Sequence, residues 1–322
     1  MRWGLFRPSE VGTKLCDLLT VPGQKALVIF NPIAGSRCRS LLESVLEELQ
    51  ALGWNTTLIE TKHAGHAEKI ASTLHEEAFN QPTVLVVAGG DGTLNEVVNG
   101  LANVGRLDTP IGLIPVGTIN LLARELKLPR EPRALAQVIS DGNFRRIALG
   151  QIAARRQTRL FLITAGVGFD ARAVLRVSRR LKLFNGKLAF IVAGIAEYLF
   201  GKRVQYQVIV GGKALVARSV LFANGKYYAG GMVWAPAAGI ERPTLEVGVF
   251  AGTGRLRVPT YVLALMTGRL RQLHDVIVHS SKEIGITGSS NEPVQADGDI
   301  VAFLPVNISV ASKGARILAS NR

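Results

Sequence analysis

Residues 83–101 read TVLVVAGGDGTLNEVVNGL, and this stretch decides which kind of fold the chain adopts. Its first six residues are mostly apolar and β-branched, which is typical of a strand buried on both faces. Three glycines follow within four positions, and the segment 94–101 then carries the pattern of a helix. A strand, a glycine-rich turn and a helix in direct succession predict an α/β unit with a parallel sheet.

The turn in this stretch, Gly89 to Gly92, has the composition of a phosphate-binding loop. Glycines allow the backbone to approach a ligand closely, and the following helix start offers N–H groups to a phosphate. Asp91 would lie where a phosphate and its magnesium meet, since a carboxylate beside a phosphate needs a bridging cation or a proton. A glycine-rich turn without any ligand is the alternative interpretation.

Two further loops follow predicted strands in the same way. GLIPVGTIN occupies residues 112–120, and NPIAGS occupies residues 31–36. Because ligands bind at the carboxyl ends of the strands in open α/β sheets, we expect all three loops to face one crevice. The alternatives are that Thr118 only caps a helix and that the Asn-Pro and Gly residues only form a turn.

The remaining pattern divides the chain in two near Asp141. Before it, predicted strands and helices alternate, with strands at 25–30, 54–60, 83–88 and 111–114 and helices at 40–52, 67–79, 94–101 and 120–126. After it, strand-like runs dominate, at 144–153, 158–165, 204–210, 214–223, 245–250, 276–278 and 284–286, with helical stretches at 171–200 and 259–270. We therefore expect an α/β domain with a parallel sheet and flanking helices over residues 1–142. A mainly antiparallel β domain over residues 143–322 would follow, with the packing of its last strands on the first domain left open.

Composition restricts the partners more than the fold. The formal net charge is +14 and the sequence pI about 10.2, which favours anionic partners but does not choose among them. The sequence carries no recognisable nucleic-acid-binding motif, so nucleic acid is not expected as a partner. No apolar run approaches the roughly 18 residues of a membrane span, so we expect a cytoplasmic protein whose membrane role, if any, is peripheral on the inner face. Cys16 and Cys38 form no CxxC pair and are interpreted as free thiols.

The three loops, taken in this order and spacing, resemble a known family. NPIAGS, GGDGTLNEVVNGL and GLIPVGTINLLARELKLP are similar to the signature blocks of the diacylglycerol kinase catalytic-domain family, which is related to sphingosine kinases. Later blocks resemble the second domain of that family, namely AGVGFD at 165–170, NGKL at 185–188, NGKYYAGG at 224–231, Ala-Pro at 235–236 and Asp-Gly-Asp at 297–299. The resemblance extends from Lys25 to Leu318.

The resemblance implies an ATP site in a cleft between the two domains. The residues implied as nucleotide-binding are Asn31, Thr61, Gly89, Gly90, Asp91, Gly92, Thr93, Asn95, Gly117 and Thr118. Asp299 matches the general base of the family, where Glu is usual, and Asp91 competes with it as base or as the Mg²⁺ ligand. A β-turn is the alternative for Asp297 and Asp299. Leu121 and Arg242-Pro243 stand where many relatives carry Asp and Asp-Gly, so a structural magnesium site of the family is not carried over.

The activity implied is that of an ATP- and Mg²⁺-dependent phosphotransferase of phospholipid biosynthesis. It would transfer the γ-phosphoryl group to a lipid hydroxyl, in diacylglycerol or a related lipid, at a membrane surface. The basic stretch 172–203, with Arg176, Arg179 and Arg180, is a candidate for docking on anionic lipid, and an ordinary solvated helix face is its alternative. A soluble enzyme similar to NAD kinases, or a regulatory protein that binds a nucleotide without turnover, are the alternative functions. The chain has no Walker-type GxxxxGK[ST] loop.

Overall fold

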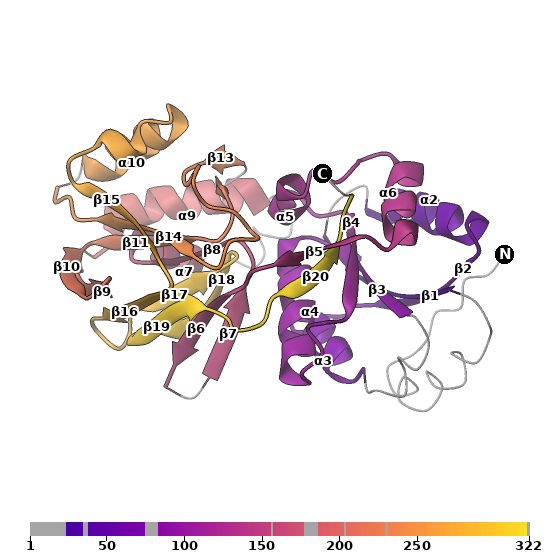
Figure 1. The fold of residues 1–322 in the computed structure, drawn as a ribbon. Helices are drawn as coiled ribbons and strands as arrows, with labels where there is room; N and C mark the ends of the chain where they lie inside the picture. Colours follow the sequence, from indigo (N-terminus) through magenta and orange to yellow (C-terminus); the bar gives the residue numbers. More distant parts are fainter. Residues whose placement is uncertain are drawn as a thin grey trace. The chain divides into compact units, whose positions relative to one another are not determined.

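The structure is a computed structural model that describes residues 24–34, 38–74, 83–155, 157–176, 186–202, 204–228, 231–254 and 256–320. Its contacts form two compact units, which are described one at a time (Figure 1). The first unit holds the chain up to Ile147 together with the segment from Lys313 onward, and the second is Ala148–Ser312.

The first unit is built on one six-stranded sheet. Its strands are β1 (Gln24–Phe30), β2 (Trp54–Glu60), β3 (Thr83–Gly89), β4 (Pro110–Pro115), β5 (Phe144–Ile147) and β20 (Ala315–Leu318), in the order β2-β1-β3-β4-β20-β5. The first four strands are parallel, as the alternating pattern predicts, and β20 runs parallel to β4 and antiparallel to β5. The last strand of the chain therefore completes the sheet that the first strands begin.

Helices cover both faces of this sheet. They are α2 (Cys38–Ala51), α3 (His66–Ser72), α4 (Asp91–Asn103), α5 (Leu121–Glu125) and α6 (Pro132–Asp141). In Figure 1, α2 and α6 pack together on one face of the sheet, and α3 and α4 on the other. The sequence analysis did not predict α6, although Glu131 caps its first turn, Pro132 opens it and Gly142 ends it at φ 68°. These three residues are ordinary helix start and stop signals.

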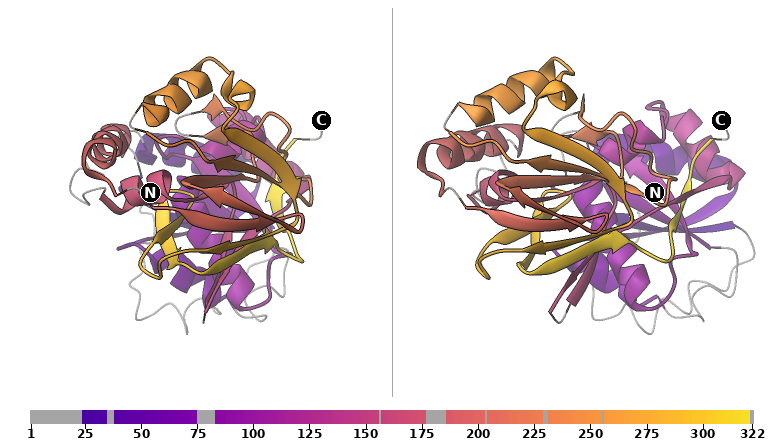
Figure 2. Two further views of the ribbon diagram at one scale, coloured as in Figure 1. Left: turned by 90° about the vertical axis from the view of Figure 1, so that its left-hand side faces the viewer. Right: turned by 60° about the vertical axis from the view of Figure 1, so that its left-hand side comes forward.

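The second unit is a sandwich of two six-stranded antiparallel sheets (Figure 2). One sheet has the order β10-β9-β16-β19-β6-β7, from β6 (Gly150–Ala154), β7 (Gln157–Phe161), β9 (Tyr206–Val210), β10 (Lys213–Ala217), β16 (Glu283–Thr287) and β19 (Val306–Val310). The other has the order β15-β14-β11-β8-β17-β18, from β8 (Thr164–Val167), β11 (Ser219–Ala223), β14 (Leu245–Phe250), β15 (Val276–Ser281), β17 (Pro293–Ala296) and β18 (Asp299–Phe303). Side chains of both sheets, such as Val208 and Phe222, form one buried core between them. A short pair, β12 (Tyr227–Tyr228) and β13 (Met232–Val233), lies apart from both sheets.

Several predicted strands are divided in the structure. The run 144–153 splits because β5 joins the sheet of the first unit while β6 joins the sandwich. The run 158–165 splits at Leu162 and Ile163, whose amides bind the side chain of Asp297. The run 214–223 splits at Arg218, where the chain passes from one sheet to the other.

The described residues of the second unit also form three helices and a 3₁₀ turn. They are α7 (Phe169–Arg176), α9 (Gly186–Phe200), α10 (Arg257–Met266) and η3 (Leu270–Gln272). Helix α7 packs on β8, β17 and α9, and α10 shares a small apolar cluster with β11, β14 and β15. Residues 177–185 of the predicted stretch 171–200, with Arg179 and Arg180, lie outside the described residues. None of the helices in the described ranges has both the length and the apolar character to cross a membrane.

Candidate active site

The carboxyl ends of four adjacent parallel strands gather most of the predicted nucleotide-binding residues of the first unit. The backbone N–H of Asn31 donates to Ala88 O at 2.9 Å, and the N–H of Thr61 donates to Phe30 O at 2.7 Å. Gly89 ends β3 in register with Pro115 of β4. Asn31, Thr61, the glycine loop and the loop after β4 therefore meet at one edge of the sheet, as the strand pattern predicts.

Hydrogen bonds between side chains connect the segments at this edge. The amide Nδ2 of Asn31 donates to Thr93 Oγ1 at 3.0 Å, which ties the end of β1 to the first turn of α4. Thr93 and Asn95 are buried, and Asn95 Oδ1 accepts a hydrogen bond from Asn99 Nδ2 at 3.0 Å. Thr118 is exposed. The residue that precedes α5 is Asn120, at φ 53°, so the interpretation of Thr118 as its N-cap is wrong.

The two glycine loops touch backbone to backbone. A Cβ atom added at Gly117 would lie 2.4 Å from the Cα of Gly90 and 2.5 Å from Asn120 Oδ1, so no larger residue fits there. Asn120 Nδ2 donates to the carbonyl oxygens of Pro115 and Gly117, whereas its Oδ1 is buried without a hydrogen-bond partner in the described part of the chain. A glycine cradle with an unused buried acceptor is the arrangement expected of a site that a further polar group completes.

Asp91 joins the two loops instead of pointing away from them. Its Oδ2 accepts the N–H of Leu121 at 2.8 Å, and its Oδ1 accepts the N–H of Leu122 at 3.1 Å. Burial raises the pKa of Asp91, and the two amide hydrogen bonds act in the opposite direction. The carboxylate therefore holds the start of α5 against the start of α4. The described residues contain no group of three or more metal-ligating side chains, around Asp91 or elsewhere.

The last predicted site residue, Asp299, lies in the second unit at a tight hairpin turn. Asp297 and Gly298 have φ angles of 47° and 90°, and Ala296 pairs with Asp299 across the turn between β17 and β18. The Asp297 carboxylate accepts three backbone N–H bonds, from Leu162 at 2.7 Å and from Ile163 and Thr164 at 3.0 Å each. Asp297 thus has a structural role at the predicted turn, while the Asp299 side chain at its end is exposed.

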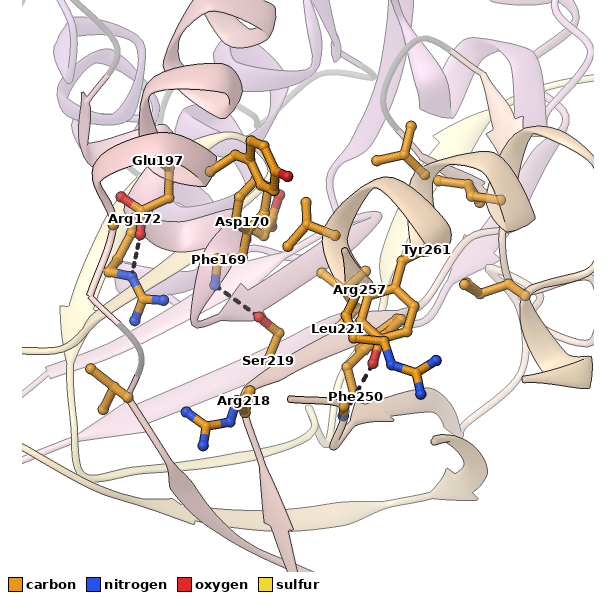
Figure 3. A pocket seen from close by; sticks show the side chains of 18 of the residues that line it. Phe169, Asp170, Arg172, Glu197, Arg218, Ser219, Leu221, Phe250, Arg257 and Tyr261 are labelled. Carbon is orange, nitrogen blue, oxygen red and sulfur yellow. Dashed lines mark hydrogen bonds and ion pairs between the residues drawn. The ribbon is translucent and has the colours of Figure 1, made fainter. Parts of the chain in front are cut away.

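The second unit also contains a pocket of about 210 Å³, which the sequence analysis did not predict (Figure 3). Helices α7 and α9 form one wall and α10 another, and β11 and β14 lie at its base. Most of its lining side chains are apolar, among them Phe169, Leu221, Phe250, Val258, Val262 and Leu265. A partly open pocket whose walls are mainly apolar but also carry charged side chains is suited to a ligand with an apolar chain and a polar end.

Two carboxylates, Asp170 and Glu197, line this pocket. Asp170 accepts hydrogen bonds from the hydroxyl of Tyr228 and from Gln295 Nε2, the latter at 2.6 Å. Burial raises the pKa of Asp170, and the hydrogen bonds from Tyr228 and Gln295 act against that rise. Both Asp170 and Tyr228 lie in the blocks AGVGFD and NGKYYAGG, so those blocks could have pointed to them, whereas no sequence signal marks Gln295.

A buried ionic network supports the same wall. Arg172 Nε lies 2.7 Å from Glu197 Oε1, and Arg176 Nε lies 2.6 Å from Glu197 Oε2. Arg172 also contacts Tyr206 and Glu292. Two arginines of the stretch proposed for lipid docking are therefore paired with a carboxylate of α9, and Arg172 faces inward. Arg172 is therefore not available to a lipid surface, and docking of the stretch on anionic lipid stays a prediction.

Comparisons with known proteins agree with this architecture. The family model of the diacylglycerol kinase catalytic domain matches residues 25–152, and that of the YegS C-terminal NAD kinase beta sandwich-like domain matches residues 163–319. The chain is 27% identical to a diacylglycerol kinase of Staphylococcus carnosus over 88% of this chain and 91% of that protein. It is 33% identical to a diacylglycerol kinase of Bacillus subtilis over 62% of this chain and 64% of that protein.

A solved structure shares the whole fold. A crystal structure of a candidate diacylglycerol kinase from Bacillus anthracis superimposes with a TM-score of 0.75 over 94% of this chain and 97% of that one, at 22% identity. The first family model lies mostly within the first unit and the second mostly within the second unit, although residues 313–319 of the second match belong to the first unit. The chain therefore belongs to the diacylglycerol kinase catalytic-domain family of lipid kinases, which transfer a phosphoryl group to an alcohol acceptor.

Proposed function

We propose that this protein transfers the γ-phosphoryl group of ATP to the hydroxyl group of diacylglycerol or a closely related lipid. The pocket of the second unit carries this proposal, because it combines mainly apolar walls with a hydrogen-bonded carboxylate at Asp170. Apolar side chains can receive acyl chains, and the polar groups can orient the hydroxyl end of the lipid.

The glycine loops of the first unit would hold the nucleotide. Asn31, Thr61, Gly89, Gly90, Gly92, Thr93, Asn95, Gly117 and Thr118 are the residues that we propose for this role. The close approach of Gly90 and Gly117, and the open N-terminus of the 13-residue helix α4, support phosphate binding there. Mg²⁺ commonly binds through one or two carboxylates together with substrate phosphates, so Asp91 is the residue we assign to it. Bound there, the cation would neutralise phosphate charge.

Asp299 is proposed as the general base. Its carboxylate would take the proton of the lipid hydroxyl while the oxygen of that hydroxyl forms a bond to the γ-phosphorus. The bond from that phosphorus to the bridging oxygen of ADP would break in the same transfer, and ADP would leave. The exposed position of Asp299 at the end of a rigid hairpin supports this role.

Filling the pocket should impair lipid phosphorylation. Val262 lines the pocket from α10 and is partly exposed. The larger side chain of Val262→Trp should therefore fill part of the pocket without disturbing the buried core. We expect kcat/KM for dioleoylglycerol in mixed micelles to fall by about tenfold or more, since one displaced apolar group is worth about 1–3 kcal/mol. Transfer from γ-labelled ATP to a panel of lipids measures this and identifies the acceptor class.

The matched control is Ile209→Trp, an exposed apolar position of β9 that does not line the pocket. Its lipid phosphorylation should equal that of the wild type. If both variants lose activity equally, or neither does, the pocket is not the lipid site. A wild type that phosphorylates NAD⁺ but no lipid would favour the enzyme class of NAD kinases. ATP binding without any product would favour the regulatory function.

A lipid acceptor must be reached at a membrane, and an apolar face beside the pocket could dock there. Its exposed side chains are Ile195, Leu199 and Phe200 at the end of α9 and Leu263 and Met266 of α10. Exposed basic residues follow these helices closely in the chain, namely Lys202 after α9 and Arg269 and Arg271 after α10. Apolar side chains together with cations suit an anionic bilayer surface, so we propose peripheral binding to such a membrane, on its cytoplasmic face.

Acidic residues on this face should weaken membrane binding. Leu263 and Met266 are 64% and 69% exposed, so Leu263→Glu with Met266→Glu should fold normally. We expect at least a tenfold loss of binding to phosphatidylglycerol vesicles, because two apolar anchors are lost and two anions repel the surface. Vesicle sedimentation measures this, with Ile209→Glu as the control. Unchanged sedimentation of the double variant would remove the docking face from the proposal.

A further inference from the structure

Gln295 is a buried polar residue that uses both ends of its side-chain amide. It is 2% exposed on β17, on the face of the sheet that α7 covers. Its Nε2 donates to Asp170 Oδ2 at 2.6 Å, and its Oε1 accepts the backbone N–H of Gly298 at 3.1 Å. One planar amide therefore connects the carboxylate in the pocket to the hairpin turn that precedes Asp299.

Other hydrogen bonds already restrict the conformation of the turn. The carboxylate of Asp297 binds three amides of the segment between β7 and β8, and the N–H of Asp297 donates to Thr164 O at 2.9 Å. With Asp297 fixed on one side, the bond from Gly298 to Gln295 determines how the second turn residue is oriented. Asp299 follows directly, so its backbone direction depends on this bond.

The contact with Asp170 requires a small residue beside it. A Cβ atom added at Gly166 of β8 would lie 2.6 Å from Asp170 Oδ2 and 3.1 Å from Gln295 Nε2. The strand carries glycine at the one place where the carboxylate and the amide meet. Adding a methyl group at Gly166 would push the carboxylate and the amide apart without removing either side chain.

We propose that Gln295 is a positioning residue, whose amide holds the hairpin of Asp299 in a fixed orientation relative to the Asp170 carboxylate of the pocket. It does not contact the reacting atoms itself. The inference rests on the proposed function, in which the lipid hydroxyl enters from the pocket and Asp299 removes its proton. A base displaced by about 1 Å can lose about 10²-fold in rate, so the loss should appear in kcat.

The test breaks the connection in two independent ways. Gln295→Met removes both hydrogen bonds at similar side-chain length, and Gly166→Ala separates the amide from Asp170. With dioleoylglycerol and γ-labelled ATP, we expect both variants to lower kcat by about 10- to 100-fold while KM for ATP changes less than twofold. Gln295→Glu keeps an acceptor for Gly298 but places a second buried carboxyl against Asp170, so it should lose at least as much activity as Gln295→Met. Gln207→Met, at an exposed position of β9, should match the wild type.

A purely structural role would lower the melting temperature and leave kcat per folded molecule unchanged, and that result would overturn the proposal. If the wild type phosphorylates no lipid, the proposed function fails, and hydrogen exchange still tests the connection. The Gly298 amide should then exchange at least tenfold faster in Gly166→Ala than in the wild type, and equal exchange would refute the inference.

Discussion

Replacing Asp299 by alanine is expected to lower kcat for lipid phosphorylation by about 10²–10⁴-fold, because a well-placed general base contributes about that much to a proton transfer. Nucleotide binding should remain close to that of the wild type, since Asp299 is an exposed residue of the second unit and the glycine loops belong to the first. Steady-state transfer from γ-labelled ATP gives kcat, and titration with a fluorescent ATP analogue gives the affinity. The melting temperature should change little.

Three further variants separate the base from its competitor. Asp299→Glu introduces the carboxylate that is usual in the family and should keep most of the wild-type activity. Asp299→Asn should be as impaired as the alanine variant. Asp91→Ala removes the acceptor for the amides of Leu121 and Leu122, so it should weaken nucleotide binding as well as turnover. If Asp299→Asn retains full turnover, Asp299 is not the base and Asp91 becomes the first candidate.

The sequence predicts the first unit well because its signals are local. Three of the four parallel strands, β1, β3 and β4, contain a continuous apolar run, and each loop at the carboxyl edge carries glycine or a short polar residue. The meeting of the three loops at one edge follows from these signals alone, whereas Thr61 was expected there only from the family resemblance. The missed helix α6 carried the same kinds of signal, so it could have been predicted as well.

Residues that act through distant partners could not be predicted in this way. Strand β20 pairs with β4, about 200 positions earlier in the chain, and nothing in the sequence of its four residues indicates this pairing. Gln295 lies in an unremarkable strand, and its importance depends on contacts with Asp170 and Gly298. The roles of such residues are set by tertiary contacts, which local patterns do not contain.

Removing the buried charge of Glu197 should destabilise the second unit strongly. Glu197 is 3% exposed and binds both Arg172 and Arg176, and its acidic character is unexpected in a helix that is otherwise apolar. Burial works to lower the pKa of Arg172, yet its hydrogen bond with Glu197 and the nearby charges leave that pKa raised. Because breaking one side of a buried ion pair leaves an uncompensated charge, we expect Glu197→Ala to lose about 3–5 kcal/mol of unfolding free energy.

An exposed pair provides the control for that loss. Asp108 lies 3.1 Å from Arg146, with both side chains more than half exposed, so Asp108→Ala should change stability by less than about 1 kcal/mol. Urea denaturation of both variants measures the difference. A similar small effect in Glu197→Ala would mean that water reaches the network. A large effect would show that this ionic network fixes α7 against α9. The wall that holds Asp170 at the pocket would then depend on a charge pair and not on apolar packing alone.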